Sequence, residues 1–205
     1  MRPGPVVALA SRNAGKLREI RTILRAAGVS VHIVSAEEFP GWEAPIEDAA
    51  DYRGNALLKA RSLASFAGVA ALADDSGIEV DALGGMPGPR SARLAGDSAT
   101  DAENLDKLVS LIVDVPAERR TARYRCVAVL ATPDGAFDVA EGTVEGTLIT
   151  EPRGSGGFGY DPIFVPSGFD CTMAELAPDE KDRLSHRGEA FRVLVPAIAR
   201  LDRES

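Results

Sequence analysis

The chain has 205 residues, of which 45% are hydrophobic and 26% are charged, as in ordinary globular proteins. Its 31 acidic and 23 basic residues give a formal net charge of −8, which disfavours a general nucleic-acid-binding surface. The two cysteines lie in no zinc-like motif, and no apolar run is long enough for a signal peptide or a membrane span. We therefore expect one cytoplasmic domain over residues 1–205, with no nucleic-acid or membrane partner.

The first half of the chain alternates apolar runs with helical patterns. After Lys16, apolar residues recur with the period of a helix and end at Gly28, and a second such pattern covers about residues 55–66 and stops at Gly68. Buried strands are predicted at residues 6–10, 31–34 and 69–73. Strands and helices that alternate in this way predict an α/β fold with a partly parallel sheet.

The second half begins with a helix and continues with extended segments. Thr100 and Glu103 have the spacing of a capping box, which predicts a helix start. Residues 121–131 and 137–149 predict two strands joined by the hairpin signal Thr-Pro-Asp-Gly. A final helix is predicted from about residue 189. This half of the sheet is expected to be antiparallel.

An acidic doublet, Asp74-Asp75, follows the apolar run 69–73 and precedes Ser76-Gly77 and the glycine- and proline-rich loop 84–93. Asp, Ser and Gly are ordinary turn formers, so the doublet taken alone also fits a solvated turn. Two adjacent carboxylates repel each other, however, and a nearby cation relieves this repulsion. The doublet placed after a buried strand therefore favours a site for a divalent metal.

Two segments could contact phosphate or metal. The segment from Ser11 to Lys16 joins the first strand to the first helix, where backbone N–H groups and a lysine attract anions. It is not a Walker A loop, and a turn with a surface lysine is the alternative interpretation. Asn55 and Lys59 share a helix face, and Glu47 and Asp48 lie nearby as acidic candidates for Mg²⁺.

Two later segments could contact a heterocycle. Residues 154–162 are rich in glycine and include Phe158, whose ring offers a stacking face, although a flexible loop with a core phenylalanine fits equally. Lys181 and the run Ser185-His186-Arg187-Gly188 supply donors that could read the edge of a base.

Five segments occur in a fixed order. They are Ser-x-Asn-x-x-Lys with Glu19, Asn55-Ala-x-x-Lys59-Ala, Ala73-Asp-Asp-Ser-Gly, Gly-Gly-Phe-Gly-Tyr-Asp-Pro and Lys181-x-x-x-Ser-His-Arg-Gly. Together, over about residues 6–201, they resemble the noncanonical purine nucleoside triphosphate pyrophosphatases, the inosine triphosphatase or Ham1-like family. The resemblance implies a single α/β domain with a central mixed sheet flanked by helices, two lobes with an active-site cleft between them, and a homodimer. It also implies Mg²⁺-dependent hydrolysis of ITP, dITP and XTP to the nucleoside monophosphate and pyrophosphate, which cleanses the nucleotide pool.

The resemblance further implies a role for each matching residue. The triphosphate would be bound by Ser11, Arg12, Asn13, Ala14, Gly15 and Lys16, and Lys59 would help to neutralise it. Glu47 and Asp75 would hold Mg²⁺, Asp75 would also be the base that activates water, and Asp74 would support it; Asp48 and Asp51 are alternatives to Glu47. Ser76 would touch the substrate, Phe158 would stack on the base, and the purine edge would be shaped or read by Gly159, Tyr160, Asp161, Lys181, His186 and Arg187.

Three alternative functions differ from this one in fold, in activity or in motif. A Maf-like nucleotide pyrophosphatase has a related fold, but the Asn-x-x-Lys start and the Ser-His-Arg-Gly end favour the first family. A nucleotide-binding sensor without catalysis would bind the same ligands and release no pyrophosphate. A haloacid-dehalogenase-type phosphatase fits poorly, because the doublet reads Asp-Asp-Ser rather than Asp-x-Asp-x-Thr.

Overall fold

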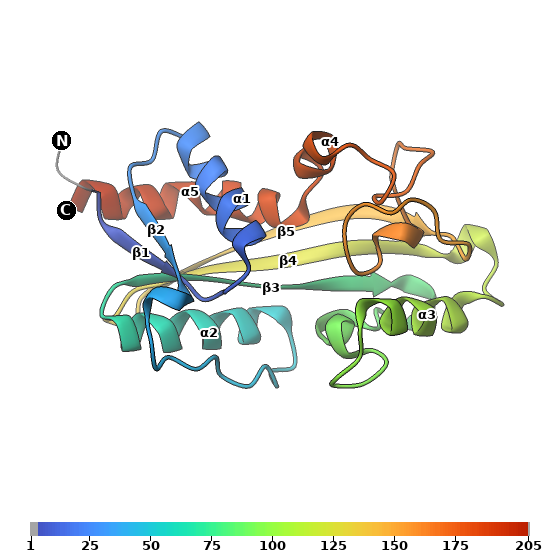
Figure 1. Cartoon of the computed structure of the whole chain (residues 1–205), viewed down its shortest axis with the longest axis horizontal. Helices are drawn as coiled ribbons and strands as arrows, with labels where there is room; N and C mark the ends of the chain where they lie inside the picture. Colours follow the sequence, from blue (N-terminus) through green and yellow to red (C-terminus); the bar gives the residue numbers. More distant parts are fainter. Residues whose placement is uncertain (1–3, 205) are drawn as a thin grey trace. The chain divides into compact units, whose positions relative to one another are not determined.

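The structure is a computed structural model that describes residues 4–204, apart from the side chains of residues 178, 179, 182 and 204. The strands are β1 (Val6–Leu9), β2 (His32–Ser35), β3 (Ala70–Val80), β4 (Thr121–Ala131), β5 (Phe137–Leu148) and β6 (Phe164–Pro166). The helices are α1 (Ala14–Ala26), α2 (Tyr52–Ala67), α3 (Asp101–Ile112), α4 (Pro178–Arg183) and α5 (His186–Glu204) (Figure 1). Within the described residues, no helix is both long and apolar enough to span a bilayer.

The six strands form one sheet in the order β2-β1-β3-β4-β5-β6. Strand β1 pairs in parallel with both β2 and β3, whereas β5 pairs with β6 in the antiparallel direction. The sheet is therefore mixed, as the sequence predicted. Between β4 and β5, the backbone N–H of Thr132 donates to the carbonyl of Ala136 at 2.9 Å, which confirms the predicted turn.

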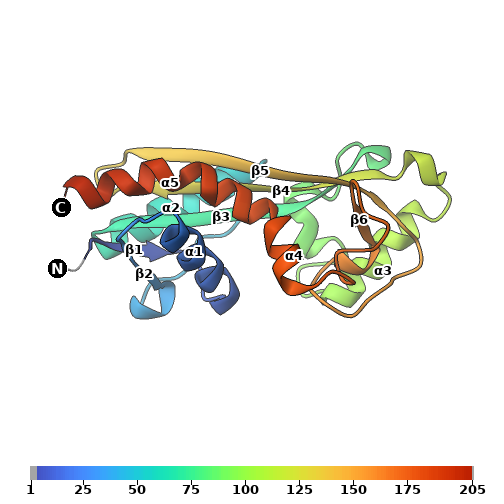
Figure 2. The same cartoon turned by 90° about the horizontal axis from the view of Figure 1, so that it is seen from above.

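The contacts divide the chain into two compact units, and each strand from β3 to β5 has residues in both. Unit 1 contains the described residues up to Asp75, Cys126–Gly142 and those from Arg187 onward, and unit 2 contains Ser76–Arg125 and Thr143–His186. In unit 1, α2 covers one face of the sheet, while α1 and α5 lie side by side on the other (Figures 1 and 2).

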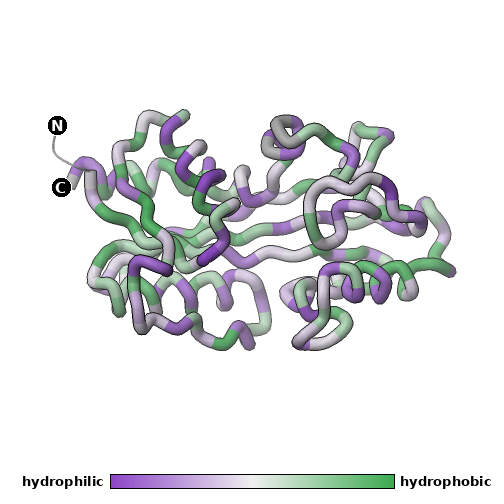
Figure 3. Tube along the Cα trace, in the orientation of Figure 1, coloured by the Kyte–Doolittle hydropathy of each residue, from purple (hydrophilic) through white to green (hydrophobic). Residues whose placement is uncertain are grey.

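Strand β3 shows why unit 1 needs an apolar sequence on both faces of its sheet. Successive side chains of a strand point to opposite faces. Leu72 packs in the core under α1 and α5, and its neighbours Ala71 and Ala73 pack in the core against α2. A strand covered on both faces reads as an unbroken apolar run rather than an alternating one, as residues 69–73 do. Figure 3 colours the chain by hydropathy and shows purple, hydrophilic stretches along the strands as well as green ones.

Unit 2 has its own core around α3. The predicted capping box is present: the Thr100 hydroxyl accepts from the backbone N–H of Glu103, whose carboxylate accepts from the N–H of Thr100. Leu108 of α3 is fully buried in a cluster with Ile78 of β3 and Phe164 of β6. The predicted start of α3 is thus confirmed, and the apolar face of the helix packs it into the core of unit 2.

Three predicted boundaries were wrong, among them the start of α2, which begins at Tyr52 rather than at about residue 55. Strand β3 does not end before the acidic doublet but continues through Asp74, Asp75 and Gly77 to Val80. The strand persists because Ile78 and Val80 are again fully buried and because the carboxylates find cationic partners, as described below. The last helix begins at His186, three residues before the predicted start at about residue 189.

Candidate active site

The doublet lies inside β3, so its two side chains point to opposite faces of the sheet. Asp74 has the direction of Leu72 and faces α1 and α5, whereas Asp75 has the direction of Ala73 and faces α2. The two carboxylates are neighbours in sequence yet have different surroundings. This separation lets them take different chemical roles.

Asp74 is held by two cations. Lys16 Nζ, from the first turn of α1, lies 2.8 Å from Asp74 Oδ2 and 3.0 Å from Oδ1, and Arg187 Nε donates to Oδ2 at 3.1 Å. Burial by itself would raise the pKa of the Asp74 carboxyl, but Lys16, Arg187 and Lys59 outweigh burial and hold the pKa well below its usual range. Lys16 and Arg187 therefore favour the ionised form of Asp74, which makes Asp74 the weaker base of the two carboxylates.

Asp75 has the opposite electrostatic balance. Asn55 Nδ2 donates to Asp75 Oδ2 at 2.9 Å, and Lys59 Nζ lies 3.9 Å from Oδ1. Burial, together with the charges of Glu47 and Asp74, raises the pKa of Asp75 above its usual value against the opposing effects of Lys59 and Asn55. A carboxylate with a raised pKa is a stronger base, as a group that activates water requires.

Glu47 belongs to the same cluster, because its Oε1 lies 3.0 Å from Lys59 Nζ. Asp51, the alternative metal ligand, instead accepts the backbone N–H of Gly54 at 2.7 Å and caps α2. Among the described residues, no group of three or more His, Cys, Asp and Glu side chains is arranged to hold a metal ion. Two carboxylates from separate segments nevertheless fit Mg²⁺, which takes few protein oxygens and completes its shell with water and phosphate.

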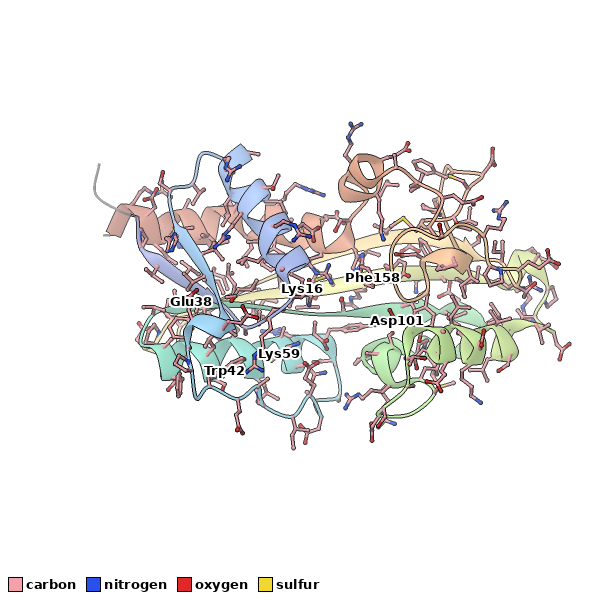
Figure 4. All side chains as sticks on the ribbon, viewed as in Figure 1. Lys16, Glu38, Trp42, Lys59, Asp101 and Phe158 are labelled. Carbon is pink, nitrogen blue, oxygen red and sulfur yellow. The ribbon has the colours of Figure 1, made fainter. Side chains whose placement is uncertain are left out.

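The segment between β1 and α1 is a capped helix start. Asn13 Oδ1 accepts the backbone N–H groups of Gly15 at 2.8 Å and of Lys16 at 3.2 Å, and Ser11 Oγ accepts the N–H of Asn13 at 3.1 Å. These three N–H groups, which the sequence suggested as anion donors, thus already have acceptors within the loop. A Cβ at Gly15 would lie 3.0 Å from Asn13 Oδ1, so the small residue keeps this cap compact. Arg12 and Ala14 are exposed in the same segment. Figure 4 shows Lys16 at the start of α1 and Lys59 on α2.

In unit 2, Asp161 organises the second predicted group. The buried carboxylate accepts the hydroxyl of Tyr124 at 3.1 Å and the backbone N–H of Phe158 at 2.9 Å, and it forms an ion pair with Lys181. Lys181 Nζ lies 5.0 Å from the centre of the Phe158 ring, which is 61% exposed. An exposed ring with a fixed backbone is suited to stack on a planar base.

Further contacts hold the loop around Phe158. Gly159 donates its N–H to Asp101 Oδ2 at 3.1 Å, and the Tyr160 hydroxyl donates to the carbonyl of Ser91 at 2.6 Å. Asp101 and Phe158 are labelled in Figure 4. His186 stacks on Tyr124 with ring centres 5.0 Å apart. The loop is thus anchored on α3, on β4 and on the proline-rich segment.

The structure therefore gathers the predicted residues into two groups. In unit 1, ion pairs join Lys16 and Arg187 to the neighbouring Asp74 and join Lys59 to Glu47 and Asp75. In unit 2, Phe158, Gly159, Tyr160, Asp161, Lys181 and His186 share the contacts described above, and Ser76 belongs to this unit directly after Asp75.

Several partners of these residues had no predicted role. Asn55 binds Asp75, Glu19 lies 3.5 Å from Arg187, and Tyr124 and Asp101 hold the Phe158 loop. Asn55 and Glu19 lie inside the motifs that carry the family resemblance, so the sequence did indicate that both could belong to the site. Tyr124 and Asp101 stood in no motif, and their contacts depend on how the chain folds.

This chain is similar to known proteins over most of its length. The Ham1 family model matches residues 7–197. A dITP/XTP pyrophosphatase of Corynebacterium efficiens is 50% identical over 200 residues, which cover 94% of this chain and 97% of the relative. A dITP/XTP pyrophosphatase of Streptomyces coelicolor is 49% identical over 193 residues, which cover 94% and 96% of the two chains.

Two solved structures are similar in fold. The structure of a HAM1 protein from Coxiella burnetii has a TM-score of 0.88 and 37% identity, covering 96% of this chain and 99% of the other. The crystal structure of a nucleoside-triphosphatase / dITP/XTP pyrophosphatase from Mycobacterium abscessus has a TM-score of 0.80 and 45% identity, covering 94% and 99%.

Proposed function

Because the chain belongs to the Ham1 family, we propose that it hydrolyses dITP, XTP and ITP to the nucleoside monophosphate and pyrophosphate. The observation that carries this proposal is the opposite environment of Asp74 and Asp75. One carboxylate is a fixed anion that holds cations, and its neighbour is a more basic carboxylate that a lysine and an amide surround. Hydrolysis of a triphosphate requires both a base for water and a cationic environment for the leaving group.

In this mechanism Asp75 accepts a proton from the attacking water. Lys16 and Lys59 stabilise the negative charge that moves onto the leaving pyrophosphate, since fixed cations favour a transition state in which that charge develops. Asp74 holds the ammonium of Lys16 at the start of α1. Glu47 and Asp75 would hold Mg²⁺, which when bound neutralises the triphosphate and acidifies water.

The remaining residues of the Ser11–Lys16 segment, namely Ser11, Arg12, Asn13, Ala14 and Gly15, are proposed to line the phosphates. Phe158 is proposed to stack on the base, and its exposed ring supports this assignment. Ser76, Gly159, Tyr160, Asp161, Lys181 and His186 are proposed to contact the substrate or shape the base site. Arg187 remains a predicted contact to the purine edge, and its bonds to Asp74 and Glu19 give it a second role as a support of Asp74.

We further propose that the protein is a homodimer in the cytoplasm. The family resemblance supports the dimer, and the two cysteines, neither of which is in a disulfide, are compatible with a reducing compartment. Light scattering coupled to size-exclusion chromatography should give twice the chain mass of 21.6 kDa. A mass of one chain at micromolar concentration would contradict the dimer.

The function is tested with a panel of ITP, dITP, XTP, GTP and ATP, assayed for pyrophosphate release with Mg²⁺ and with EDTA. We expect release from the first three nucleotides, little from ATP, and none with EDTA. The matched variant Asp75→Asn should bind the nucleotides without turning them over. If the wild-type chain binds dITP but releases no pyrophosphate, it is a sensor and the proposal fails.

A further inference from the structure

Asn55 occupies an unusual place in the first turns of α2. Asn55 is 1% exposed in relative terms, and both ends of its side-chain amide are hydrogen-bonded to other segments of unit 1. Asn55 Nδ2 donates to Asp75 Oδ2 of β3 at 2.9 Å, and Asn55 Oδ1 accepts the backbone N–H of Ala49 at 2.9 Å. One buried side chain thus bridges the strand that carries Asp75 and the loop that carries Glu47.

The chemistry of the two partners fixes the orientation of this amide. A backbone N–H can be accepted only by the amide oxygen, so the amide NH₂ must face the carboxylate of Asp75. Asp75 Oδ2 is therefore engaged, and Oδ1 is the oxygen that lies 3.9 Å from Lys59 Nζ. Lys59 in turn contacts Glu47 at 3.0 Å. The bonds close a ring that runs from Glu47 through Ala49, Asn55, Asp75 and Lys59 back to Glu47.

A close backbone approach supports the bridge. A Cβ built on Gly54 would lie 2.6 Å from the Cβ of Ala49 and 3.2 Å from Asp51 Oδ1. The absence of a side chain at Gly54 therefore lets the loop lie against the first turn of α2. In this position the N–H of Ala49 reaches Asn55.

We propose that Asn55 is a positioning residue that sets the distance and orientation between the Glu47 and Asp75 carboxylates. The proposal rests on the proposed function, because it concerns the pair assigned to the metal. Groups that hydrogen-bond to metal ligands orient them, and their loss commonly lowers metal affinity or activity by about 10- to 100-fold. Lys59 contacts the two carboxylates themselves, whereas Asn55 joins one of them, Asp75, to the backbone of the loop that carries the other.

The test compares Asn55→Ala with the matched control Asn104→Ala. Asn104 is also a buried asparagine that bridges a helix to a loop: its Oδ1 accepts the N–H of Ala95 at 2.8 Å and its Nδ2 donates to the carbonyl of Ala92 at 3.1 Å. Asn104 lies in α3 of unit 2 and touches neither predicted ligand. Each variant is measured for Mn²⁺ affinity by electron paramagnetic resonance without nucleotide, for unfolding midpoint, and for kcat and KM on dITP with Mg²⁺.

We expect Asn55→Ala to weaken Mn²⁺ binding by at least about 10-fold and to lower kcat more than it raises KM, while Asn104→Ala changes stability alone. In a second variant, Asn55→Asp, one carboxylate oxygen can still accept the backbone N–H of Ala49. The other oxygen replaces the donor NH₂ and faces the Asp75 carboxylate, so the kcat of this variant should fall at least about 10-fold. The positioning role would be overturned if Asn55→Ala bound Mn²⁺ with wild-type affinity or if Asn55→Asp kept the wild-type kcat. It would also be overturned if the wild-type chain showed no saturable Mn²⁺ binding. A wild-type chain that binds Mn²⁺ but releases no pyrophosphate from any nucleotide would instead refute the proposed function.

Discussion

Replacing Arg187 with methionine tests how the buried Asp74 carboxylate is stabilised. The change removes the bond from Arg187 Nε to Asp74 at 3.1 Å and the contact of Arg187 Nη1 with Glu19 at 3.5 Å. Methionine keeps an apolar stem of similar length, so most of the packing is retained. The side chain of Asp74 is 1% exposed, and solvent therefore cannot replace the lost partner.

The size of the effect follows from this burial. Removing one partner of a buried ion pair costs about 3–5 kcal/mol, because the remaining charge is left uncompensated. Asp74 keeps both of its bonds to Lys16, so we expect the lower end, a loss of about 3 kcal/mol in the free energy of unfolding. For a chain of this length, that loss corresponds to a decrease in Tm of about 6–12 °C.

The assay is urea unfolding at pH 7 followed by far-ultraviolet circular dichroism. Arg200→Met is a matched control on the same helix, because Arg200 pairs with Asp138 at 2.6 Å but the two side chains are 51% and 43% exposed. An exposed pair contributes less than about 1 kcal/mol. If Arg187→Met cost no more than Arg200→Met, the buried ion network would not stabilise unit 1 as argued.

Three further changes test the site. Asp75→Asn removes the base and a metal ligand with little change of shape, so kcat on dITP should fall at least about 100-fold; a variant retaining half of the wild-type kcat would exclude Asp75 as the base. Lys59→Met removes the cation between Glu47 and Asp75. We expect kcat/KM to fall by similar factors for dITP and XTP, because a contact to phosphate carries no information about the base. A change in the ratio of kcat/KM between dITP and XTP would contradict a phosphate contact for Lys59. Gly157→Ala should raise KM for dITP and lower Tm, because Gly157 has φ of 79° and a Cβ there would lie 2.1 Å from Asp161 Oδ2; wild-type values of both would contradict the structure of this loop.

Periodicity in the sequence was enough to predict most of the fold. The apolar spacing predicted α1, α2, α3 and both long strands of the second half, because each pattern extends over many residues and ends at a glycine or a turn signal. The short strands β1 and β2 were also predicted from their apolar runs, but two other short elements were not. Strand β6 has three residues and α4 has six, and segments of this length carry too few periods to be distinguished from a loop.

The ordered motifs in the sequence indicated which residues form the site and, through the family resemblance, which role each would have. The physical environment of each residue depended on the tertiary structure. Asp74 and Asp75 are chemically identical side chains, and although the family resemblance implied that Asp75 is the base, nothing in the residues alone distinguished the two or indicated that both lie inside a strand. Pleating sends Asp74 toward α1 and α5 and Asp75 toward α2. Asp74 thereby meets Lys16 and Arg187, which lower its pKa, whereas burial raises the pKa of Asp75. A pKa depends on distances between charges from distant parts of the chain, and only folding sets those distances.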